Sequence, residues 1–172
     1  MTQVIEYGNP LLYDKVAQEL NDKLYLLGHI DDLFPVCFTG YDDEDTYPEV
    51  YINDGEKVSL RVMPDSTKSL SFFTITGDMS DMEEYHMEVP MALCVWMNLQ
   101  KVAPAKKYDF TTEIIRDCFN TLRDYGCYDL VVDVNTPFDG FTQLSNQLTA
   151  NLMRPYSGFK ISFNKTIDVC QS

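Results

Sequence analysis

The sequence predicts an α+β domain, with a mostly antiparallel sheet, an N-terminal helix, one or two further helices packed on the sheet, and a long C-terminal strand. Three observations lead to this class. Val89–Val102 is apolar on both alternating faces for about ten residues, as in a strand at the middle of a sheet. Two stretches, 9–28 and 110–126, carry apolar residues at helical spacing. Phe159–Val169 alternates apolar and polar residues, which is typical of a strand with one buried face.

The first helix is expected to begin at Asn9-Pro10, because asparagine caps free amides and proline suits the first helical position. Gly28 is placed to end it. Core packing is the favoured role of its apolar face, with docking of a partner as the alternative. That face consists of Leu12, Tyr13, Val16, Ala17, Leu20, Leu24 and Leu27.

Short extended segments follow the first helix. Phe34–Phe38 is expected to be a strand, and Glu49–Met63 a hairpin, because Asn53-Asp54-Gly55 is a strong turn signal. Ser69–Thr76 is expected to be the next strand. An acidic connection, Gly77–Glu88, then leads to the central strand.

The second half of the chain alternates helices and strands. Ala103-Pro104-Ala105 breaks the central strand, and a helix is expected over 110–125, closed by Gly126. Tyr128–Val134 predicts a strand, with Leu130, Val132 and Val134 alternating against aspartates. Asp139–Asn151 predicts a weaker helix.

The last strand, Phe159–Val169, is long enough to exceed about 30 Å. We expect its far end to leave the domain and pair with a neighbouring copy, since an unpaired strand edge favours such pairing. The methionines of the acidic connection and its neighbourhood are expected either to fill gaps in the core or to face a partner. The hypothetical oligomer interface therefore contains Phe159, Ile161, Phe163, Ile167, Val169, Met79, Met82 and Met87.

Length and composition bound the class of protein. With 172 residues the chain can bury a sizeable core, so we expect one domain spanning 1–172, with 159–172 as a candidate arm between subunits. No stretch approaches the roughly 18 consecutive apolar residues that cross a bilayer, so no membrane span is expected. The N-terminus has no signal-peptide pattern, which predicts that the protein stays in the compartment where it is made. Five widely spaced cysteines without a Cys-x-x-Cys pair predict reduced thiols rather than disulfides or a zinc site.

The charge is strongly negative. With 27 acidic and 13 basic residues, the net charge is −14. Nucleic-acid binding depends on lysine and arginine, and the largest basic group here is Lys101 with Lys106 and Lys107, so ordinary nucleic-acid binding is disfavoured. Either a solubilising surface or a negative wall or mimic directed at DNA or a basic partner explains the acidity.

Catalytic motifs are absent from the sequence. It contains two histidines, His29 and His86, and has no Gly-x-Ser-x-Gly, phosphate-binding glycine loop or His-Glu-x-x-His. The acidic clusters Asp42–Asp45 and Asp78–Glu84 do not follow a calcium-loop pattern and are interpreted as solvated loop charge. We therefore expect no enzyme activity, no catalytic or metal-binding residues and no cofactor.

The chain resembles the tail-terminator or tail-completion and neck-ring (head-tail connector) proteins of tailed bacteriophages, most closely those of Bacteroides-infecting, crAss-like phages. Besides the N-terminal helix and the helix after the central strand, three segments carry the resemblance, namely Ser69-Leu-Ser-Phe-Phe, Val89–Val102 and Phe159-Lys-Ile-Ser-Phe. These patterns cover much of the chain but include no catalytic signature.

The resemblance implies a non-enzymatic virion protein that forms a homo-oligomeric ring at the phage neck or tail and is assembled in the cytoplasm of the host bacterium. Its implied partners are portal, connector and tail proteins, with DNA passing through the lumen without sequence-specific binding. The alternative is a monomeric acidic inhibitor that mimics DNA and blocks a nucleic-acid-binding protein, for which the net charge of −14 is suitable.

Overall fold

The computed structural model describes residues 3–4, 12–55, 57–82, 85–150 and 155–170. This part of the chain contains ten strands and four helices. In chain order they are β1 (Gln3–Val4), α1 (Leu12–Leu27), β2 (Asp32–Val36), β3 (Phe38–Asp42), β4 (Asp45–Asp54), β5 (Lys57–Arg61), β6 (Leu70–Ile75), β7 (Ser80–Met82), β8 (His86–Asn98), α2 (Leu99–Val102), α3 (Thr111–Asp124), β9 (Tyr128–Asp133), α4 (Thr142–Ala150) and β10 (Tyr156–Asp168).

The strands form two sheets. The main sheet has seven strands in the order β1-β2-β6-β8-β10-β9, with β7 paired to one end of β8. The small sheet has the order β3-β4-β5. Only the pairs β1–β2 and β2–β6 are parallel among the described strands. The predicted α+β class with a mostly antiparallel sheet is therefore confirmed.

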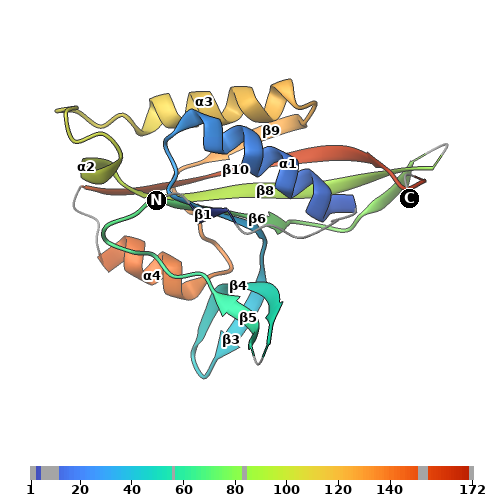
Figure 1. Cartoon of the computed structure of the whole chain (residues 1–172), viewed down its shortest axis with the longest axis horizontal. Coiled ribbons are helices and arrows are strands. Elements are labelled where there is room, and N and C mark those ends of the chain that lie inside the picture. Colours follow the sequence, from blue (N-terminus) through green and yellow to red (C-terminus); the bar gives the residue numbers. More distant parts are fainter. Residues whose placement is uncertain (1–2, 5–11, 56, 83–84, 151–154, 171–172) are drawn as a thin grey trace.

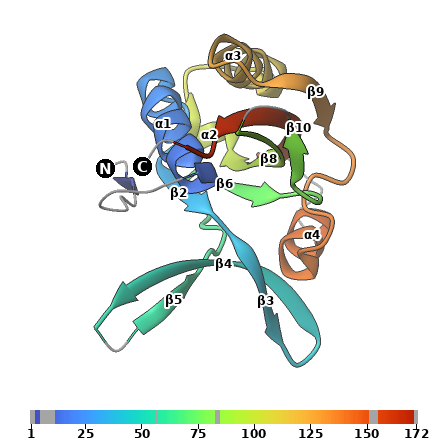
Figure 2. The same ribbon diagram turned by 90° about the vertical axis from the view of Figure 1, so that its right-hand side faces the viewer.

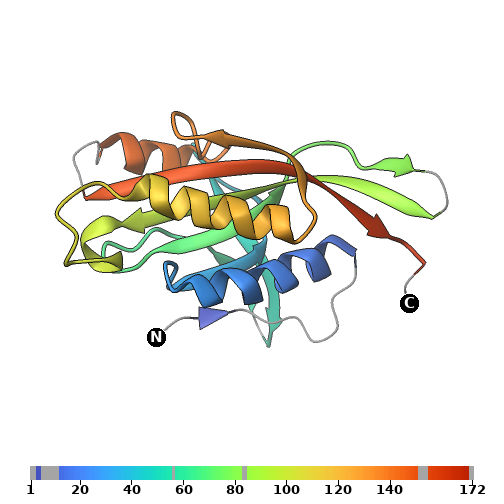
Figure 3. The ribbon, with the colours of Figure 1, turned by 90° about the horizontal axis from the view of Figure 1, so that it is seen from above.

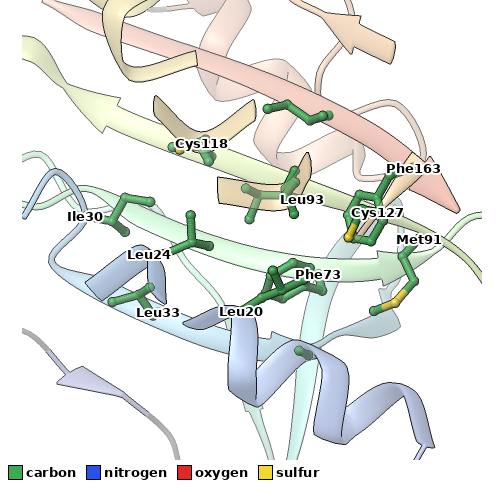
Figure 4. Close-up of a cluster of buried hydrophobic side chains, with 14 of the residues drawn as sticks. Leu20, Leu24, Ile30, Leu33, Phe73, Met91, Leu93, Cys118, Cys127 and Phe163 are labelled. Carbon is green, nitrogen blue, oxygen red and sulfur yellow. The ribbon is translucent and has the colours of Figure 1, made fainter. Parts of the chain in front are cut away.

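The elements lie in layers around the main sheet. Helices α1 and α3 cover one face, and α4 and the small sheet lie on the other (Figure 1). The larger core cluster joins α1, α3 and the first face, where Phe73 and Phe163 meet edge to face with ring centroids 6.5 Å apart (Figure 4). The second cluster lies on the opposite face of the main sheet, where Phe72 and Trp96 pack with Phe138. Both faces of the central strands are therefore buried, as the continuous apolar run of β8 predicts.

Both long helices confirm the predictions. Helix α1 is followed by Gly28 at φ +69°, and α3 is followed shortly by Gly126 at φ +85°. Glycine suits these left-handed positions because it has no Cβ. The predicted start at Asn9-Pro10 lies outside the described residues.

The central strand ends earlier than predicted. Strand β8 stops at Asn98, and Leu99–Val102 forms the short helix α2. The Asn98 side chain accepts a hydrogen bond from the Gln100 amide and donates one to the Ser66 carbonyl. This cap starts a helix after Asn98, in a segment whose apolar pattern is compatible with either a strand or a helix.

The predicted acidic connection 77–88 also needs correction. Part of it forms β7, which pairs with the start of β8, so that Ser80 lies opposite Glu88 and Met82 opposite His86. With β10, these strands extend beyond the helices as an arm (Figure 3). The arm is defined here as residues 79–82, 85–88 and 166–169.

The small sheet extends the predicted hairpin. The pairing of β4 with β5 confirms the turn prediction, but β4 begins at Asp45 and also pairs with β3. The predicted strand Phe34–Phe38 straddles two strands, since β2 ends at Val36 and β3 begins at Phe38. In Figure 2 the β3–β4 and β4–β5 strand pairs diverge from each other and extend away from the main sheet.

The C-terminal strand does not leave its own sheet. Strand β10 pairs with β8 over its whole length, from Tyr156 opposite Asn98 to Asp168 opposite His86. On its other side β9 pairs only with the part between Lys160 and Asn164. The expectation that the far end leaves the domain is therefore wrong, because β8 accompanies β10 to Asp168, whereas pairing of its other side with a neighbouring copy stays a prediction.

Candidate functional site

The apolar row of β10 belongs to the protein's own core. Phe159 and Ile161 are completely buried, and Phe163 and Ile167 are at most 7% exposed. Their side chains point to the face covered by α1 and α3. These four residues of the predicted interface are therefore core residues, because the strand pattern that suggested an interface is the pattern of a buried face.

The other predicted interface residues lie on the arm. Met79, Met82 and Val169 are each about 40% exposed, and Met87 is half-buried. The Thr166 hydroxyl donates to the Met82 sulfur, and the Val169 amide donates to the Tyr85 carbonyl. The structure thus brings the methionine side chains and the end of β10 together, as partly exposed apolar surface.

A second exposed apolar surface lies on the edge strand β9. Val131 is 63% exposed, Val132 38%, and Val134, just after the strand, 52%. The alternation of Val132 and Val134 predicts the strand correctly. It does not reveal that the strand lies at the edge of the sheet, where these side chains are exposed. Edge position depends on which strands pair, and the local sequence does not encode it.

The small sheet is the third exposed surface, and sequence reasoning missed its separate existence. Tyr41 is 78% exposed, Val58 60%, Phe38 52% and Tyr51 50%. Alternating aromatic and β-branched residues on both sides of the Asp43-Glu44 turn were the available signal. The cluster Asp42–Asp45 is therefore a hairpin turn.

A stack of side chains holds the strands of the small sheet together. The Arg61 guanidinium lies 3.8 Å from the centre of the Tyr47 ring, and its Nη1 is 3.2 Å from Oδ2 of Asp42. Its Nε donates to Gln143 on α4 at 3.0 Å. The Tyr47 ring lies over Gly40, where any Cβ would overlap it. One arginine therefore links all three strands to α4.

The small sheet is anchored to the body at its base. Val50 and Val62 are completely buried in the second core cluster. Next to the turn of the β3–β4 hairpin, the Thr46 hydroxyl donates to the Gly140 carbonyl at 2.8 Å, and the Thr142 amide donates to the Thr46 hydroxyl at 2.9 Å. Asp43 and Glu44 in that turn remain exposed.

The titratable groups of the body form ordinary structural contacts. His29 lies 3.1 Å from Asp117, and a hydrogen bond from Arg116 is the main cause that lowers the pKa of Asp117. His86 lies on the exposed arm. In the described residues no group of three or more His, Cys, Asp or Glu side chains is placed to hold a metal ion. The acidic cluster 78–84 lies only partly within the described residues.

Two hollows lie beside these surfaces. One, of about 420 Å³, lies between the two sheets and is lined by Cys37, Cys94 and Lys160 among others. Burial raises the pKa of the Cys94 thiol to about 12 and that of Cys37 well above its usual range, so neither is a thiolate nucleophile at neutral pH. The other, of about 390 Å³, is lined in part by Lys106 and Lys107. Lys106 is already paired with Glu113.

Comparisons with protein-family models, curated proteins and solved structures found no match for this chain. Among the described residues, no helix has both the length and the apolar character needed to cross a membrane.

Proposed function

We propose that this chain is a non-enzymatic structural subunit that assembles with copies of itself into a ring at the neck or tail of a bacteriophage, around the DNA channel. The proposal joins the resemblance of the sequence to neck and tail proteins with the surfaces described above. Portal, connector and tail proteins are the proposed neighbours in the virion.

One observation carries the proposal: two unlike apolar surfaces lie on opposite sides of the subunit. In Figure 2 the small sheet, which exposes Tyr51 and Val58, lies away from the β9 edge, which exposes Val131. A cyclic head-to-tail assembly requires two different, mutually complementary patches on each subunit. Exposed apolar surface of this kind is typical of protein interfaces.

The net charge of −14 is compatible with a channel through which DNA moves. An acidic wall repels the phosphate backbone, so DNA slides past without being held. The charge also makes the subunits repel one another, and salt screens this repulsion. Ring formation is therefore expected to increase with ionic strength.

Electron microscopy of the purified chain tests this proposal. We expect closed rings of uniform diameter at high protein concentration and raised salt. Val131→Lys, on the β9 edge, should remove the rings, whereas Leu26→Lys should keep them. Leu26 is a suitable control because it is 81% exposed on α1, away from both surfaces. Single particles of subunit size under all conditions would contradict the proposal.

The net charge of −14 also supports a second candidate function, a monomeric acidic inhibitor of a nucleic-acid-binding protein. Such an inhibitor would bind a basic protein tightly at low salt and lose affinity steeply as salt rises. Salt therefore acts in opposite directions on the two functions.

A further inference from the structure

Four strands lie at the ends of the two described sheets, β1 and β9 in the main sheet and β3 and β5 in the small sheet, and of these β5 and β9 carry opposite charges. The outward N–H and C=O groups of such edge strands have no neighbouring strand and can accept an extended segment from another molecule. Figure 2 places β5 and β9 on opposite sides of the molecule. The two edges therefore cannot pair within one copy.

Strand β5 is an exposed strand with a positive charge at each end. Its sequence is Lys57-Val-Ser-Leu-Arg61, and Lys57–Leu60 are exposed on both faces of the strand. Val58 is 60% exposed and Leu60 37%. In a chain with 27 acidic and 13 basic residues, no other strand that ends either sheet has two cations.

Strand β9 has the opposite charge pattern. Asp129 and Asp133 are separated by Leu130, Val131 and Val132, so the two carboxylates have the same four-residue spacing as the two cations of β5. Asp129 is exposed, and Val131 is 63% exposed. The register with β10 is regular from Val131 to Asp133 and shifts before it, towards Tyr128.

We infer that β5 of one copy pairs with β9 of the next copy in a single antiparallel register. This inference rests on the ring assembly proposed above and specifies the strands that form its interface. The register places Lys57 opposite Asp133, Val58 opposite Val132 and Ser59 opposite Val131, all within the regular part of β9. It ends there, because Asp129 has a left-handed φ of +53° and the Arg61 guanidinium already lies over Tyr47 and binds Asp42. Directly opposite side chains share a face, so Lys57 meets Asp133 on one face and Val58 packs against Val132 on the other.

Pairing of identical edges is disfavoured by the same charges. Two copies of β9 paired antiparallel about Val131 would place Asp129 opposite Asp133, and two copies of β5 about Ser59 would place Lys57 opposite Arg61. Like charges directly opposite one another destabilise a strand pair. The charges therefore select the unlike pair β5–β9, and an unlike pair is what a head-to-tail ring requires.

A disulfide trap tests the register. All variants carry Cys170→Ser, because Cys170 is the exposed thiol and the other four are buried. Val58→Cys and Val132→Cys are made on separate chains, mixed, and oxidised with copper phenanthroline. The register brings these two Cβ atoms within the range that a disulfide spans. We expect covalent dimers in the mixture, and about tenfold fewer with either variant alone.

Three other outcomes would overturn the inference. Self-association without a covalent dimer would exclude the β5–β9 interface and leave the ring proposal standing. A dimer formed by Val58→Cys with Leu130→Cys, but not with Val132→Cys, would show parallel pairing and overturn the register. Absence of self-association at any concentration or salt would remove the ring proposal and this inference together.

A charge reversal supplies an independent measurement. Lys57→Glu should weaken self-association about fivefold or more at moderate salt, because it replaces an attractive pair with a repulsive one. Lys15→Glu, at an exposed position of α1, changes the net charge by the same amount and should have little effect. Equal weakening by both variants would show that only the overall charge matters, which contradicts specific pairing of β5 with β9.

Discussion

The main sheet and the small sheet are stabilised in different ways. The central strands of the main sheet are covered on both faces, and residues such as Leu93 and Val95 are completely buried. The small sheet buries Val50 and Val62 at its base and depends beyond them on cross-strand contacts around Arg61. The main sheet therefore holds the stabilising core, and the small sheet keeps much of its apolar surface exposed.

The largest expected difference between the two regions comes from the same substitution made in each. Phe163→Ala should lower the free energy of unfolding by about 3–5 kcal/mol, because the ring is 2% exposed and its removal leaves a cavity. Phe38→Ala, in the small sheet, should cost less than about 1.5 kcal/mol, because that ring is 52% exposed. Urea unfolding measures both. Similar losses would contradict the assignment of the stabilising core to the main sheet.

High pH should act mainly on the body of the protein. Burial raises the pKa of Cys94 and Cys118 to about 12 and that of Cys127 to about 11. Unfolded thiols lose their protons near pH 8.5, so the unfolded chain binds fewer protons above that pH and the free energy of unfolding falls. We expect a loss of about 5 kcal/mol between pH 8 and 10, with just under 2 kcal/mol from each thiol.

Urea unfolding across this pH range measures the effect, and Cys118→Ala should reduce the slope. A free energy of unfolding that stays constant or rises from pH 8 to 10 would contradict the burial of these thiols.

Gly40 tests the packing of the small sheet. Gly40→Ala should destabilise this sheet by about 1–3 kcal/mol, because the new Cβ would overlap the Tyr47 ring and lie 2.7 Å from a carboxylate oxygen of Glu49. Amide hydrogen exchange of β3 and β4 measures the local loss. Combining Gly40→Ala with Tyr47→Ala should cost less than the sum of the two single changes, since the ring is then absent. Additive losses would show that the ring does not lie over Gly40.

The smallest expected effect belongs to Arg61. Arg61→Lys keeps the charge but loses the planar group that lies over Tyr47 and binds Asp42 and Gln143, so a loss of about 1 kcal/mol is expected. Thermal unfolding measures this loss. Lys68→Arg serves as a control, because Lys68 pairs only with the Asp32 carboxylate among the described contacts. An equal effect of both changes would contradict the special role of the Arg61 stack.

The sequence allowed the local elements of the fold to be predicted better than the surfaces. Helices α1 and α3 and strands β6 and β10 follow from apolar periodicity, because a buried face leaves a regular pattern in the chain. The pattern cannot tell whether an apolar row faces the protein's own core or a partner, so Phe159 and Ile161 were assigned to an interface although they lie in the core.

The exposed surfaces depend on long-range pairing. The edge position of β9 follows from the sheet order, and the separation of the small sheet follows from the break between Val36 and Phe38, where one sheet ends and the other begins. The end of β8 was missed for a different reason, since the Asn98 cap forms partly with the distant Ser66 carbonyl.

The most direct test of the central claim is the native mass of the purified chain by light scattering, across protein concentration at low and high salt. We predict a mass that grows with concentration towards one defined oligomer and is larger at high salt, because salt screens the repulsion between subunits of charge −14. A mass that stays at 19.8 kDa under all these conditions would contradict the claim that this protein assembles with itself.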